Sequence, residues 1–224
     1  SGFSPEAALQ WGMAAGAELP ELPAVSVFPQ IAMKTKPSLE QAQLCIGAPS
    51  YPIAHEKRFA CYLMNTILGG GMSSRLFQAV REEQGLVYHI SSELTLYRDS
   101  GAMGIYAGTS PGTLGRVVTS VMKELRGMKD GFVTAEELRR AKENLKASVV
   151  LGLESTSSRM SNIARQELFF GRFTDMEEIV AAIEAVTEAD VQEIANTFLT
   201  QENLALTVVA PPGTQRFSRR DLAC

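Results

Sequence analysis

The order of strand-like and helix-like patterns along the chain limits its possible folds more than any other feature. One buried strand is expected at residues 41–47, and two more flank a turn at residues 98–101. Apolar residues alternate through residues 103–107, which directs one face of this hairpin toward a core. Later patterns are helical until a closing strand at residues 204–210. Strands grouped early and helices grouped late favour an α+β layer fold over an alternating parallel sheet.

Capping residues and glycines divide the remaining chain into helices. The expected helices cover residues 54–68, 74–85, 111–131, 134–149, 157–170, 175–183 and 187–198. The second of these helices carries Leu76, Phe77 and Val80 on its apolar face. Thr134 and Glu137 have the spacing of a capping box, which marks the start of the long fourth helix.

Composition excludes several classes of function. The chain has 21 Lys and Arg against 25 Asp and Glu, so nucleic acid is not expected as its main partner. No run approaches the ~18 apolar residues of a membrane span. His55 and His89 are not spaced as HExxH or HxxEH, so we expect no catalytic metal site in this chain. The three cysteines form no CxxC pair and are expected to be reduced, mostly buried thiols.

We divide the chain into a leading segment, one domain and a tail. Residues 1–37 combine a helix pattern at residues 4–15 with a Pro-rich stretch, which suggests the tail helix of a preceding half followed by an interdomain linker. Residues 38–212 form the domain, and the basic tail at residues 213–224 is expected to fray. No signal-peptide pattern is visible. We favour a cytoplasmic location, and a periplasmic one stays open if a signal peptide precedes this stretch.

Three consecutive glycines, Gly69, Gly70 and Gly71, are the clearest local signal for a binding loop. Because they lack side chains, a ligand main chain or a phosphate could approach the backbone closely. The run lacks the Lys-Ser/Thr ending of a P-loop and does not match GxGxxG, so nucleotide binding is weakly supported. On these letters alone, a break between two helices is the favoured interpretation.

Arg81 and Tyr88 are the second feature that could indicate a functional site. Arg81 is expected in the last turn of a helix, where a cation suits the helix dipole even without a function. Tyr88 is expected in the strand after the Gly85 turn, so the two side chains could converge on one face. A guanidinium and a phenol placed together can hold a peptide carbonyl or a developing oxyanion. From spacing alone, a structural role is favoured.

Residues 68–88 are more specific as a block than as separate motifs. The block reads LGGGMSSRLFQAVREEQGLVY. It closely resembles the second-half domain of the M16 zinc metallopeptidases, the family of mitochondrial processing peptidase, pitrilysin and insulin-degrading enzyme. The resemblance covers about residues 38–210 and is strongest to the shorter bacterial processing-peptidase branch. It continues through residues 97–101, 106–109, 136–142 and 153–156.

The resemblance implies one half of a two-half enzyme. Members of the family pair two similar α+β halves around a chamber, each with a largely antiparallel sheet and helices packed on one face, as in LuxS and mitochondrial processing peptidase. The first half carries HxxEH and a distal Glu that bind zinc and activate water. The second half lends an Arg and a Tyr, which match Arg81 and Tyr88, to contact the substrate backbone and stabilise the tetrahedral intermediate. The run Gly69 to Gly71 matches a loop that handles substrate in some members.

No HxxEH occurs in the 224 residues, which agrees with a second-half assignment. The resemblance therefore implies no cofactor in this chain and zinc in a complementary HxxEH-bearing half, on the same polypeptide or on a partner chain. It also implies a peptide substrate, and the isolated chain is expected to be inactive. The alternative is a catalytically inactive interaction or assembly subunit, as in the core proteins of respiratory complexes. A nucleotide-binding protein that uses the glycine run is the third hypothesis.

Overall fold

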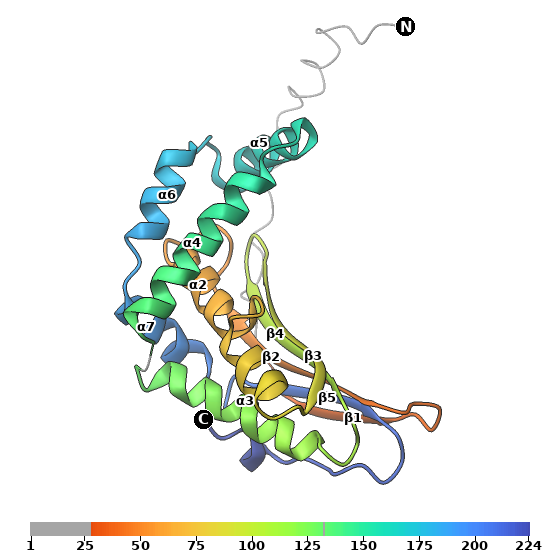
Figure 1. The fold of residues 1–224 in the computed structure, drawn as a ribbon. Helices are drawn as coiled ribbons and strands as arrows, with labels where there is room; N and C mark the ends of the chain where they lie inside the picture. Colours follow the sequence, from red (N-terminus) through yellow and green to blue (C-terminus); the bar gives the residue numbers. More distant parts are fainter. Residues whose placement is uncertain (1–27, 132) are drawn as a thin grey trace, which may run out of the picture.

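A computed structural model describes residues 28–131 and 133–224 of the chain. The helix expected at residues 4–15 lies outside the described residues. Five strands form one sheet in the order β1-β5-β2-β4-β3 (Figure 1). They are β1 (Ile31–Thr35), β2 (Ala42–Ser50), β3 (Val87–Leu96), β4 (Gly101–Thr109) and β5 (Ala205–Ala210). Among the described strands only β1 and β5 run parallel to each other, so the prediction of a largely antiparallel sheet is confirmed.

β1 is the element that the sequence interpretation missed. We expected an irregular extended linker through residue 37 and no strand before residue 41. Ile31–Thr35 instead forms an edge strand beside β5, between Pro29 and Pro37. An edge strand tolerates flanking prolines because its outer backbone groups face solvent. Its partner lies near the other end of the chain, so no local pattern reveals the pairing.

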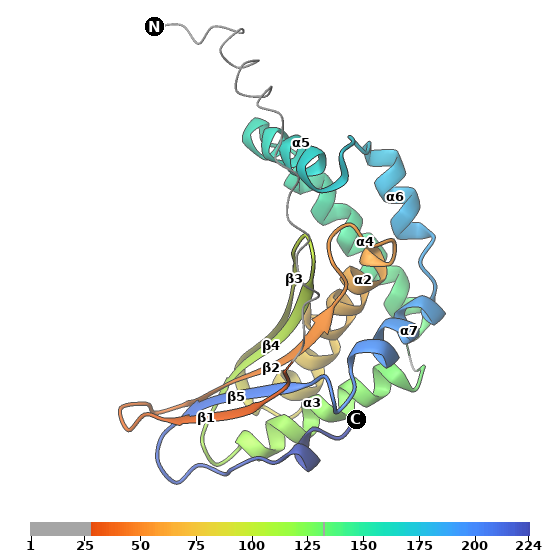
Figure 2. The same cartoon turned by 180° about the vertical axis from the view of Figure 1, so that it is seen from behind.

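The helices lie on one face of the curved sheet, and the opposite face carries no helix within the described range (Figures 1 and 2). They are α2 (Arg58–Gly69), α3 (Leu114–Lys129), α4 (Ala135–Gly152), α5 (Thr156–Phe170), α6 (Met176–Glu184) and α7 (Glu188–Phe198). Two shorter helical segments are the π-helical turn η1 (Phe77–Glu82) and the 3-10 helix η2 (Arg219–Leu222). α2 packs against β3, and α7 packs against β2. The α+β fold with helices on one face is therefore confirmed.

The core lies between the sheet and the helices α2, α3 and α7. Alternate strand residues such as Ile46, Ile105 and Leu206 are buried, because successive side chains of a strand point to opposite faces. They meet apolar helix positions such as Leu63 and Leu125, which are also fully buried. The sheet, these three helices and η1 are called the body below.

The second part of the helical layer is much less buried. The arm, residues 145–184, consists of the end of α4 together with α5 and α6 (Figure 1). Within it, only Gln166, Thr174 and Ile183 are buried. Its large exposed apolar side chains are Val150, Leu151, Met160, Ile163, Leu168 and Phe173.

The C-terminal segment is ordered by specific contacts, so the expectation that residues 213–224 fray was wrong. Leu222 is fully buried in the core. Arg219 donates hydrogen bonds to the backbone carbonyls of Gln201, Leu204 and Pro29. Lys129 Nζ donates to the Cys224 carbonyl at 2.8 Å. One buried leucine and these charged donors hold a segment whose polar composition suggested a loose tail. Among the described helices, none has the length and apolarity needed to cross a membrane.

Candidate functional site

Arg81 is positioned by a local irregularity of the helical segment after α2. In η1 the backbone N–H of Glu83 donates to the carbonyl of Gln78 at 2.9 Å, five residues back rather than four. Gly85, with φ of 59°, ends the segment in the left-handed region that glycine adopts without strain. A π-helical turn rotates its side chains relative to an α-helix, and such turns are frequent at functional sites.

Tyr88 is positioned by a second irregularity, at the start of β3. Val87 pairs with Thr109 and His89 pairs with Gly108, so Tyr88 is the extra residue of a β-bulge. Val87 is buried while Tyr88 is 84% exposed. Bulges near active sites re-aim one side chain out of the regular alternation. The bulge therefore turns the Tyr88 phenol outward while its neighbour stays in the core.

The structure brings Arg81 and Tyr88 together. Arg81 Cζ lies 6.0 Å from the centroid of the Tyr88 ring and 4.5 Å from that of Phe77. A cation over an aromatic ring is attracted by the ring quadrupole, so both rings hold the guanidinium in place. The nearest carboxylate is that of Glu82, whose Oε1 lies 3.7 Å from Arg81 Nη1.

Phe77 is the member of this cluster that the sequence interpretation treated only as a helix-face residue. It is half-buried and contacts the Arg81 guanidinium. Its spacing from Arg81 is a signal that could have found it, because side chains four residues apart on a helical segment are neighbours.

The polar ends of this cluster are available to a ligand. Within residues 28–131 and 133–224, nothing hydrogen-bonds to the Tyr88 hydroxyl or to the Arg81 guanidinium. A guanidinium offers five N–H donors and a phenol one O–H donor. Together they can bind a carbonyl oxygen or a developing oxyanion from one side.

The glycine run lies apart from Arg81 and Tyr88. Gly69 packs against Ser92, where a Cβ would lie 2.5 Å from the backbone nitrogen. Ser92 is four positions along β3 from Tyr88, which is roughly 13 Å of strand. At Gly70 a Cβ would lie 2.7 Å from Thr66 Cα, whereas at Gly71 it would meet nothing within 4 Å. Close packing therefore explains why glycine is needed at positions 69 and 70, whereas packing does not require glycine at position 71.

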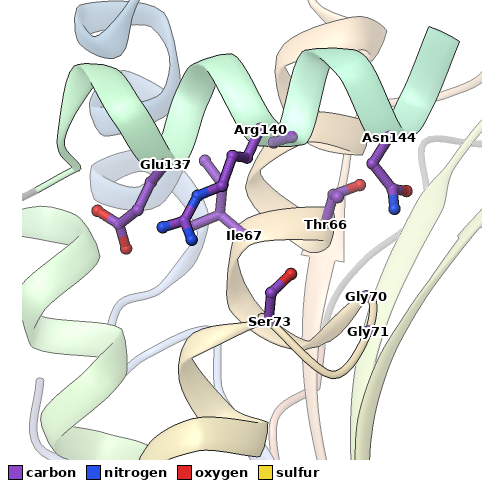
Figure 3. Close-up of a pocket in the computed structure, with 9 residues that line it drawn as sticks. Thr66, Ile67, Gly70, Gly71, Ser73, Glu137, Arg140 and Asn144 are labelled. Carbon is purple, nitrogen blue, oxygen red and sulfur yellow. The ribbon is translucent and has the colours of Figure 1, made fainter.

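Gly70 and Gly71 line a small polar cavity between α2 and α4 (Figure 3). Its volume is about 70 Å³, well below the roughly 300–1,000 Å³ of small-molecule sites. The cavity can hold a few waters rather than a peptide. Ser73 lines it from the loop, and Arg140 and Asn144 line it from α4.

Glu137, on the rim of this cavity, is tied into the fold. Arg75 Nε and Nη2 donate to its two carboxylate oxygens at 2.8 and 3.0 Å. Thr134 and Glu137 also form the predicted capping box at the start of α4. Burial raises the pKa of Glu137, but the hydrogen bonds from Arg75 and Thr134 outweigh it and leave the pKa lowered. The carboxylate is therefore held ionised as a structural group.

The described residues do not fit a zinc site. In the part of the chain that the structure describes, no three His, Cys, Asp or Glu side chains gather closely enough to hold a metal ion. His55 stacks on Tyr51 with ring centroids 3.7 Å apart. His89 is exposed, and its Nε2 lies 3.2 Å from Ser91 Oγ.

A family model and two sequence relatives connect this chain with M16 peptidases and with zinc proteases, respectively. A family model described as the peptidase M16 inactive domain matches residues 8–145. An uncharacterized zinc protease of Bacillus subtilis, YmxG, is 37% identical over 90% of this chain and 48% of its own length. An uncharacterized zinc protease of Streptomyces coelicolor is 38% identical over 80% of this chain and 39% of its own length. The chain thus spans less than half the length of these relatives.

Solved structures share the fold. A peptidase M16 inactive domain from Pseudomonas fluorescens superimposes with a TM-score of 0.74 at 24% identity, over 89% of this chain and 49% of that one. A chain of Complex III2 from Candida albicans superimposes with a TM-score of 0.80 at 18% identity, over 92% of this chain and 52% of that one. At these identities the likeness concerns the fold.

Proposed function

The chain belongs to the peptidase M16 family as its inactive domain, and we propose that it serves as the non-zinc half of a zinc metalloendopeptidase. In this proposal it lends substrate-binding and transition-state-stabilising groups to a site whose metal is held by a complementary half. In this proposal the metal is held by that other half, and the described residues of this chain form no cluster suited to it. The HxxEH motif would lie elsewhere on the same polypeptide or on a partner chain, and the substrate would be a peptide.

The observation that carries the proposal is the placement of Arg81 and Tyr88. Two separate irregularities, a π turn and a β-bulge, direct the two side chains to one place. No described residue hydrogen-bonds to their polar ends, and Glu82 is the one described carboxylate within ion-pair distance of Arg81. Folding alone gains little from an exposed tyrosine at a bulge. The arrangement suits an arginine that orients the substrate carbonyl and a tyrosine that donates to the oxygen as it gains negative charge.

The test uses the two-half protein, as one polypeptide or as this chain combined with its complementary half. Arg81→Ala is expected to lower kcat/KM for a peptide by about 10², since misplacement of the reacting group has that cost. Arg98→Ala is the matched control, because Arg98 is an exposed arginine in the β3–β4 turn. Equal kcat/KM in the Arg81 variant and the control would contradict the proposal.

An inactive assembly subunit is the second candidate function. It is supported by the fold shared with a chain of Complex III2, at an identity that shows the fold alone. The sequence of the complementary half discriminates between the two. A half with HxxEH and chelator-sensitive peptide cleavage supports the enzyme, and a half without the motif supports the assembly role.

A further inference from the structure

A second cavity lies where the arm meets the start of α2. It is lined by residues of α2, α4, α5 and α6 and has a volume of about 280 Å³. This is near the lower limit of about 300 Å³ for small-molecule sites. Four aromatic residues contribute to its wall: Phe59, Tyr62, Phe169 and Phe170. The cavity is separate from the Arg81–Tyr88 cluster and shares no lining residue with the glycine loop.

Arg58 places a desolvated cation on this aromatic wall. Its Cζ lies 4.5 Å from the centroid of the Phe59 ring and 5.0 Å from that of Phe170. Its hydrogen bond to the His55 carbonyl is long, at 3.5 Å, and no described carboxylate lies within ion-pair distance. Burial is the largest influence on the pKa of Arg58 and lowers it, although Glu178 lies within electrostatic range and opposes the shift.

Three further polar side chains, those of Arg165, Tyr62 and Gln166, line the same cavity. Arg165 lines it from α5 and makes no hydrogen bond or ion pair with the described residues. Burial raises the pKa of Tyr62, and the charges of Arg165 and Arg58 oppose that rise, so the phenol lies within electrostatic range of both arginines. Gln166 is only 5% exposed, and its Oε1 accepts from the Thr174 backbone N–H at 2.5 Å, which leaves its Nε2 as a further donor.

The charge of the lining is one-sided. It contains two arginines and no Asp or Glu, in a chain whose net charge is −4. Two other cations of the arm are paired with carboxylates, Arg172 with Glu178 and Lys146 with Glu184, and Arg159 donates to the Leu153 carbonyl. An anion that enters the cavity would therefore meet positive charge from both arginines and no carboxylate in the lining. The apolar rings beside these cations favour an anion that carries an apolar body.

We propose that this cavity binds a small amphipathic carboxylate of the medium-chain fatty-acid class. The carboxylate lies between Arg58 and Arg165, which form charge-assisted hydrogen bonds with it. The acyl chain lies against Phe59, Phe169 and Phe170, which exclude water from it. The volume suits an acyl chain of medium length rather than a long one.

The test is calorimetric titration of the two-half protein with decanoate. We expect saturable binding at one site per copy of this chain. Acetate, which has the charge without the chain, and decyltrimethylammonium, which has the chain with the opposite charge, are expected not to saturate the site. Absent decanoate binding, or equal binding of the cationic amphiphile, would overturn the proposal.

Variants identify the cavity as the place of binding. Arg58→Gln and Arg165→Gln are each expected to weaken decanoate binding at least about tenfold, since each removes a charged donor. Arg98→Gln is the control and is expected to bind like the wild type. Arg165 is exposed, so its variant retains the fold even if Arg58→Gln is destabilised. Unchanged decanoate affinity in Arg165→Gln would overturn the proposal. Peptide turnover is measured in parallel, because it tests the role of Arg81 independently of decanoate binding.

Discussion

The body and the arm are built from similar residues but are stabilised in different ways. In the body, large apolar side chains such as Leu63, Ile105 and Leu125 are fully buried between sheet and helices. In the arm, Leu168 is 79% exposed and Phe173 is 60% exposed. Helix caps and surface ion pairs, rather than a core, define the arm. The body therefore holds its own shape, while the arm leaves apolar and cationic groups available for other contacts.

Replacing a leucine by alanine is expected to cost far more stability in the buried body than in the exposed arm. Leu63→Ala in the body removes a fully buried side chain and is expected to lower the free energy of unfolding by about 2–5 kcal/mol. Leu168→Ala in the arm is expected to change it by no more than about 0.5 kcal/mol. Urea denaturation of both variants measures the difference. Similar losses in the two variants would mean that the arm has a core of its own.

Replacing a glycine by alanine is expected to change stability in opposite directions in the body and in the arm. Gly69→Ala in the body places a Cβ 2.5 Å from the Ser92 nitrogen and is expected to destabilise by about 1–3 kcal/mol. Gly152→Ala at the end of α4 meets nothing within 4 Å and is expected to stabilise by up to about 1 kcal/mol. Thermal unfolding of both variants provides the check. Stabilisation by Gly69→Ala would show that the contact between α2 and β3 has room for a methyl group, contrary to the prediction.

A smaller difference is expected between the stability contributions of two ion pairs, Arg75–Glu137 in the fold and Arg172–Glu178 in the arm, when the pH is lowered. The pKa of Glu137 is lowered, so its contribution to stability is complete above the ordinary carboxyl pKa of about 4.3 and is lost as pH falls through the folded value. Glu137→Gln is therefore expected to cost about 1–2 kcal/mol at pH 7 and less at pH 3. Glu178 has the same sign of shift but is fully exposed in the arm, so Glu178→Gln is expected to have the smaller effect. Denaturation at both pH values, with and without added salt, separates them. A larger loss for Glu178→Gln would reverse the comparison.

Local signals predicted much of the fold. The capping box at Thr134 starts α4 as expected, because it satisfies the first N–H groups of its own helix, and α7 begins after Thr187 as expected. The alternation of Met103, Ile105 and Ala107 identified the buried face of β4 correctly. These features depend on neighbours a few residues away, which the sequence displays directly.

Features that depend on distant partners could not be predicted in the same way. β1 exists because β5 lies beside it, and the C-terminal segment is ordered because Leu222 reaches the core. At the candidate site, the sequence placed Arg81 and Tyr88 on either side of a turn. The π turn and the bulge that aim them appear only in the structure, because β4 pairing creates the bulge. The separation of Gly69 from Tyr88 along β3 also required the strand itself.

In the proposed function, Tyr88 serves the chemistry of a two-half peptidase rather than the fold of this chain. The most direct test compares kcat for Tyr88→Phe and Tyr97→Phe in the two-half protein, since Tyr97 is an exposed tyrosine just beyond the other end of β3. We expect Tyr88→Phe to lower kcat by about 10²–10³ with unchanged stability, as for loss of an oxyanion donor, while Tyr97→Phe retains wild-type turnover. Wild-type turnover in Tyr88→Phe, or equal losses in both variants, would contradict it.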